Sequence, residues 1–145
     1  MAKYNGSKLE CSEERINALM VEYDRCIMSC SVVRRHEIFK KIVNSPCSRF
    51  WVSGFRAAVV MAGIMRGDDL SGMRPLKREM FHEIYRRVLE LQKRHPDYSL
   101  YRLACLAVLQ PAPKFYMSPS SAKIMFYKAK KEWYRRKGLL RKYSH

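Results

Sequence analysis

The stretch VNSPCSRFWVSGFRAAV, at residues 43–59, returns 65 positions later as VLQPAPKFYMSPSSAKI, at residues 108–124. No gap is needed, and most non-identical positions in the middle of the alignment keep their chemistry. The identical pairs are Val43/Val108, Pro46/Pro111, Phe50/Phe115, Ser53/Ser118 and Ala57/Ala122. A repeat at this spacing predicts two copies of one supersecondary unit. Any function of the cation–aromatic–aromatic segment within the stretch is then present twice.

Around this stretch the apolar residues recur with a helical period almost throughout. The pattern predicts an all-α fold of about six helices, arranged as two tandem three-helix pseudo-repeats in one compact domain, residues 1–145. Ser53 and Ser118 are the expected N-caps of the third helix in each copy, and Gly138 is expected to end the last helix. The predicted boundaries are about 12–67 for the first pseudo-repeat, 68–74 for a linker, about 75–138 for the second and 139–145 for a basic tail.

Each copy contains a helix, a connection and a second helix, which is loosely similar to helix-turn-helix regulators. The connections, about 45–52 and 110–117, are longer than the three- or four-residue turn of that motif. The helix after Ser53 is also too apolar to enter a DNA groove. The second copy is therefore the expected reader of any ligand, and the first copy is expected to be mainly structural.

Charge is the strongest functional signal in the sequence. The net charge is +16, and residues 99–145 carry eleven Lys and Arg against one acid, Glu132. A chain this basic is attracted to polyanions: nucleic acid first, and an anionic membrane or an acidic protein second. The longest apolar run, residues 57–65, is too short to cross a bilayer, so no membrane partner is expected.

The cysteines indicate a reducing environment. The chain has five, an odd number with no CxxC pair, which is typical of intracellular thiols and not of a disulfide scaffold. The N-terminus lacks an apolar segment of the signal-peptide kind. A cytoplasmic location is therefore expected, on the nucleoid or in a virion.

The two connections are the first candidate site. Arg49 and Trp51 in one, and Lys114 and Tyr116 in the other, place a cation and an aromatic ring before a helix N-terminus. Such an end attracts phosphate, and rings beside cations stack on unpaired bases. The phenylalanine between each cation and ring is expected to be buried, whereas Trp51 and Tyr116 can face either way and the two cations are as well explained by simple solvation.

The last helix is the second candidate site. Ala122, Met125, Ala129 and Trp133 form a narrow apolar stripe, and cations cover the remaining surface. So much like charge is repulsive at i,i+4 spacing, and a phosphate backbone is the expected compensation. The candidate contact residues are Lys123, Lys128, Lys130, Lys131, Arg135, Arg136, Lys137, Arg141 and Lys142.

Catalytic and metal signals are weak. Glu79 and His82 match half of a di-iron helix motif that needs a second pair, and salt-linked surface residues are the expected outcome. The glycines are scattered and form no phosphate loop. No enzyme, metal or cofactor is expected.

The segments 111–116 and 50–53 resemble small proteins of bacterial mobile elements and phages, a resemblance that implies no activity. We expect a non-enzymatic nucleic-acid-binding protein, with DNA preferred, acting as a regulator or an architectural protein. Two alternatives stay open: an RNA-binding accessory or ribonucleoprotein component, and a basic adaptor or virion protein that binds an acidic partner. Self-association is compatible with each.

Overall fold

The computed structural model describes the backbone of residues 11–29 and 35–143, and the side chains of 11–29 and 37–138. Within these ranges the chain is all-α, as predicted, and contains no strand. The helices are α2 (Ser12–Ser29), α3 (Arg35–Val43), α4 (Gly54–Met65), α5 (Pro75–Arg94), α6 (Leu100–Val108) and α7 (Pro119–Tyr143).

The helix starts follow local sequence signals. The Ser53 hydroxyl accepts a hydrogen bond from the backbone N–H of Arg56 at 3.1 Å, and the Ser118 hydroxyl accepts one from Ser121 at 3.1 Å. Each serine therefore satisfies a donor that the first helical turn leaves unpaired. The predicted caps of α4 and α7 are confirmed.

The end of α7 differs from the prediction. The helix continues through Gly138 to Tyr143, so the expected break and separate tail are wrong. A glycine inside a helix costs only about 1 kcal/mol relative to alanine. The good helix formers on either side of Gly138 offset that cost.

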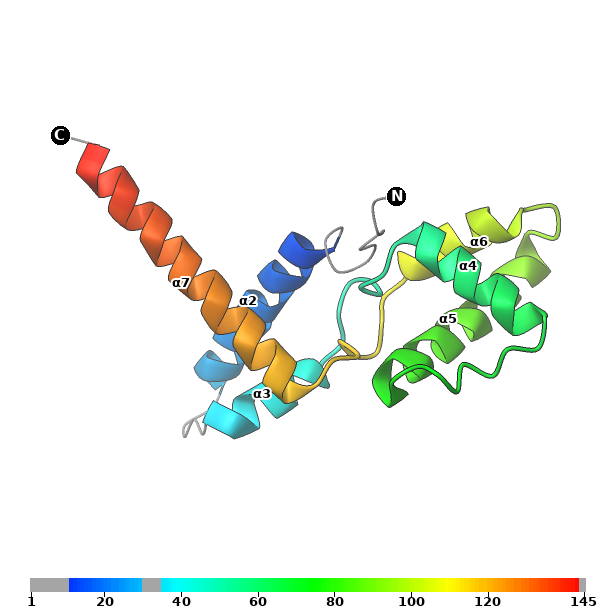
Figure 1. Ribbon diagram of the computed structural model, residues 1–145, viewed down its shortest axis with the longest axis horizontal. Coiled ribbons are helices and arrows are strands. Elements are labelled where there is room, and N and C mark those ends of the chain that lie inside the picture. Colours follow the sequence, from blue (N-terminus) through cyan, green and yellow to red (C-terminus); the bar gives the residue numbers. More distant parts are fainter. Residues whose placement is uncertain (1–10, 30–34, 144–145) are drawn as a thin grey trace.

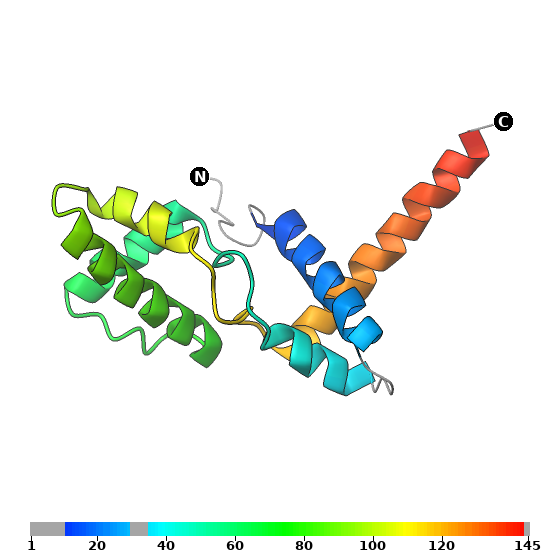
Figure 2. The ribbon, with the colours of Figure 1, turned by 180° about the vertical axis from the view of Figure 1, so that it is seen from behind.

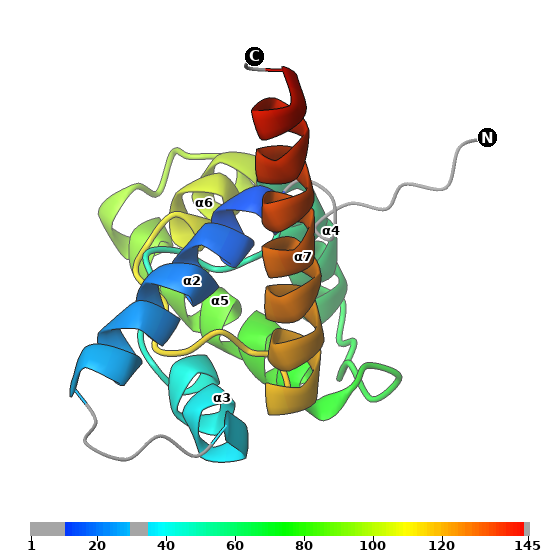
Figure 3. The ribbon, with the colours of Figure 1, turned by 90° about the vertical axis from the view of Figure 1, so that its left-hand side faces the viewer.

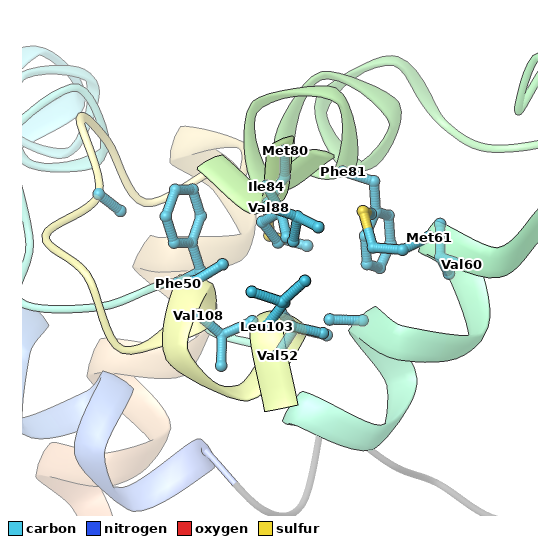
Figure 4. Packing of buried hydrophobic residues seen from close by; sticks show 14 of the residues in the cluster. Phe50, Val52, Val60, Met61, Met80, Phe81, Ile84, Val88, Leu103 and Val108 are labelled. Carbon is cyan, nitrogen blue, oxygen red and sulfur yellow. The ribbon is translucent and has the colours of Figure 1, made fainter. Parts of the chain in front are cut away.

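The helices form two lobes, each with its own apolar core (Figure 1). The first lobe contains α2, α3 and α7, and the second contains α4, α5 and α6. Phe39 and Ile42 are fully buried in the first lobe, whereas Phe81 and Ile84 are fully buried in the second. Figure 4 shows the second core, with side chains from α4, α5 and α6 converging on one another.

The third helix of each predicted pseudo-repeat packs in the lobe of the other. α4 packs mainly on α6, and α7 packs on α3 and α2. The helices that flank a connection therefore lie in different lobes, unlike successive helices of a helix-turn-helix unit. The three helices of a predicted pseudo-repeat do not form one packed unit.

The two connections run antiparallel between the lobes (Figure 2). Cys47 and Ala112 exchange two backbone hydrogen bonds of 3.0 and 2.9 Å. On either side, the Phe50 N–H donates to the Val108 carbonyl and the Phe115 N–H donates to the Val43 carbonyl, both at 2.9 Å. The second of these bonds is the first one displaced by 65 residues in donor and exchanged in copy. The connections are thus related by a local twofold.

The aromatic residues obey the same relation. Phe50 stacks on Tyr116 and Phe115 stacks on Trp51, each with ring centroids 6.0 Å apart. Both phenylalanines are buried, as the sequence predicts. These correspondences are those expected of a duplication, and the duplication itself stays a prediction.

Candidate nucleic-acid interface

α7 carries most of the predicted contact residues, and only its first turns are packed. Ala122 and Phe126 are buried in the first lobe, and Phe126 stacks on Tyr23 with centroids 4.3 Å apart. Beyond Phe126, no side chain described up to Gly138 is buried. The C-terminal turns of the helix project past α2 (Figure 3). We call residues 127–143 the distal half of α7.

The predicted cations of α7 lie on its surface. Lys130 is half-buried, and the side chains of Arg141 and Lys142 fall outside the described residues although their backbone is helical. The exposed cations are Lys123, Lys128, Lys131, Arg135, Arg136 and Lys137. The structure therefore brings these six together on one helix.

Little negative charge balances these cations. The one acid of α7, Glu132, accepts Arg135 at 2.6 Å and lies 3.4 Å from Arg136. Helix α5 differs, because there Arg86 is bound by Glu83 at 2.6 Å and by Glu90 at 2.7 Å. α7 holds nine Lys and Arg against one acid, and α5 holds six against three. Positive charge is thus concentrated on α7.

Two exposed aromatic residues lie among these cations. Trp133 is 49% exposed and Tyr134 is 57% exposed, with ring centroids 5.0 Å apart. The Lys137 ammonium lies 4.4 Å from the Trp133 ring centroid. The sequence pattern assigned Trp133 to the apolar stripe, which was wrong because the first lobe ends before this turn. Tyr134 was missed as a candidate.

The connection cations mainly brace their own backbone. Arg49 donates to the carbonyls of Phe50 and Val52 at 3.0 and 2.9 Å, and its guanidinium lies 3.7 Å from Glu14. Lys114 contacts Glu79 at 2.6 Å, which is the same ion pair displaced by 65 residues. Both are partly buried, at 19% and 26% side-chain exposure. These interactions explain Arg49 and Lys114 without a ligand.

The connection rings are not free to stack on bases. Trp51 is 5% exposed and belongs to the first core, with its ring on Phe115. Tyr116 packs against the second core, and burial raises its pKa to about 12, with smaller contributions from Glu83 and Glu79. The prediction that Trp51 contacts nucleic acid is wrong. The structure places the connections between the lobes, away from the end of α7 (Figure 1).

No catalytic arrangement accompanies these features in the described part of the chain. Glu83 is bound by Arg86 and Arg87, which hold the pKa of its carboxyl below the ordinary value. With Glu79 paired to Lys114, the expectation of salt-linked residues is confirmed. Burial raises the pKa of the Cys47 thiol to about 11, which opposes the nucleophilic thiolate form.

Two searches of the described residues were negative. No group of three or more potential metal ligands occurs among them. No helix there is both long enough and apolar enough to span a membrane.

No family model, curated protein or solved structure matches this chain. The functional argument therefore rests on its own residues.

Proposed function

We propose that this chain is a non-enzymatic nucleic-acid-binding protein that contacts the phosphate backbone through the distal half of α7. The observation that carries the proposal is the exposure of many α7 cations on turns whose described side chains are not buried in either lobe. Phosphate contacts displace condensed counterions and thereby stabilise such a surface. The remainder of the fold holds this helix by its first turns.

DNA is the first candidate ligand. The distal half is about 25 Å long at 1.5 Å per residue, or roughly seven base pairs at 3.4 Å each. The major groove of B-form DNA admits an α-helix, whereas the major groove of A-form RNA is deep and narrow. A helix with cations on most sides can contact both strands that border a groove. RNA is the second candidate.

Salt-dependent binding tests the proposal. Fluorescence anisotropy of a labelled DNA duplex is measured across a range of salt concentrations, with a labelled RNA hairpin for comparison. Log K is expected to fall linearly with log salt, with a slope of about −0.9 per phosphate contacted. No retention on either probe near physiological salt would exclude the proposal.

A charge variant locates the surface. Changing Lys130, Lys131, Arg135 and Arg136 to Gln should abolish most binding and reduce the slope by up to about four contacts. A matched control removes four exposed cations of the second lobe: Arg66, Lys77, Lys93 and Arg94. Circular dichroism checks helicity in both variants. Equal losses in the two would mean that net charge, and not α7, controls binding.

A further inference from the structure

We infer that Trp133 and Tyr134 form a subsite for unpaired bases, so that the preferred ligand contains a single-stranded segment, such as an overhang beside a duplex. The inference deepens the proposed function and rests on it. It concerns the strand form of the ligand, which phosphate contacts alone do not select.

The two rings have no packing role in the described lobes. The last buried side chain before them is Phe126, about two helical turns earlier. Trp133 and Tyr134 instead contact each other edge to face, with an interplanar angle of 74°. Exposed aromatic rings that meet at an angle offer two differently directed faces to a ligand.

Cations surround these rings on the same side of the helix. Lys130 precedes Trp133 by three positions and Lys137 follows it by four, so both lie next to its ring. The Lys137 ammonium lies over the ring face at 4.4 Å. That cation–π contact is exposed and weaker than the stacking of a base. A base can therefore replace Lys137 on the ring, and the lysine can then bind the adjoining phosphate.

The chemistry favours unpaired bases over a continuous duplex. Inside a duplex both faces of each base are covered by its neighbours, so an aromatic ring gains no face to stack on. Every unpaired base has an open π-face, and stacking on aromatic residues tolerates all sequences. The expected preference is therefore for strand form and not for base identity.

Three probes of the same duplex test the inference: a blunt end, a single-stranded thymine overhang, and an abasic overhang of equal length. The abasic overhang retains the phosphates and removes the bases. We expect the thymine overhang to bind about 5- to 150-fold more tightly than the abasic one. Trp133→Ala should remove that difference, and Trp133→Phe should restore part of it. Binding of the blunt duplex should be unchanged in both variants.

Tryptophan fluorescence gives a second readout. The chain has two tryptophans, and Trp51 is buried. In a Trp51→Phe variant the signal comes from Trp133 alone, and the thymine overhang should quench it more than the abasic overhang does. Salt-dependent binding of all three probes with equal affinity would overturn the subsite and leave the proposed function intact. Absence of binding to every probe would overturn both, and tighter binding to anionic phosphatidylserine vesicles would assign the surface to a membrane.

Discussion

Gly54→Ala tests the closest helix crossing in the molecule. Gly54 begins α4 at the point where α4 passes Cys105 of α6. A Cβ added at Gly54 would lie 2.4 Å from the Cys105 Sγ, 3.1 Å from its Cα and 3.2 Å from its Cβ. Carbon atoms in favourable contact are about 3.5–4.0 Å apart. The Sγ can rotate away, but the Cα can move only if the two helices separate.

The expected cost follows from these distances. Overpacking a well-packed core costs about 1–3 kcal/mol, and the gain in helix propensity from Gly to Ala is less than about 1 kcal/mol at a helix start. The net loss of stability should be about 1–3 kcal/mol, or roughly 2–4 °C in Tm per kcal/mol for a chain of this size. Gly138→Ala is the matched control, because no atom lies within 4 Å of its added Cβ. That variant should be stabilised by up to about 1 kcal/mol.

Thermal and urea unfolding monitored by circular dichroism give both values. A double variant with Cys105→Ala separates the two contributions, because it removes the contact at 2.4 Å and leaves those at 3.1 and 3.2 Å. It should recover part of the loss as a favourable coupling energy. DNA binding well below Tm should be unchanged, since Gly54 lies in the lobe without α7. A Gly54→Ala variant as stable as the parent would refute the reasoning about the α4–α6 crossing.

Three further outcomes are expected. Phe50→Ala should lower the free energy of unfolding by about 3–5 kcal/mol, measured by urea titration, because the ring is fully buried between the lobes. Deletion of residues 132–145 should change Tm little and abolish duplex binding in anisotropy, since the buried residues of α7 precede the cut. For Cys47, the folded pKa of about 11 exceeds the ordinary 9.0. Stability is therefore lost as pH rises between these values, and to a smaller extent in Cys47→Ser. Alkylation followed by mass spectrometry should also find this thiol slower to react in the folded chain than in urea.

The helix boundaries were predictable because they depend on neighbouring residues. Ser53 and Ser118 each cap a helix with their own hydroxyl, and Pro75 and Pro119 occupy first-turn positions that need no N–H donor. These signals act over three or four residues and are visible in one sequence. Gly138 shows the converse, since a single weak breaker does not end a helix when the flanking residues favour it.

The assignment of helices to lobes was not predictable from local signals. Phe50 and Trp51 are adjacent, yet Phe50 is buried in the second core and Trp51 in the first. Successive side chains of an extended segment point to opposite sides, so each connection contributes to both cores. Two apolar rings next to each other do not reveal which lobe takes which. For the same reason the sequence could not exclude Trp51 from the candidate site.

The inequality of the two halves locates the candidate site more sharply than the charge does. α4 ends at Met65, whose counterpart at the offset of 65 residues is Lys130. Up to that point α4 and α7 have equivalent tasks, and Ala57 and Ala122 are both fully buried. Beyond Lys130 the second copy has no counterpart in the first and no lobe to pack against. Trp133 and Tyr134 lie on this unmatched extension, and their exposure could have been inferred from its length. A helical extension that contributes no buried side chain to either core, yet concentrates cations and aromatic rings, is better explained by an external ligand than by the stability of the fold.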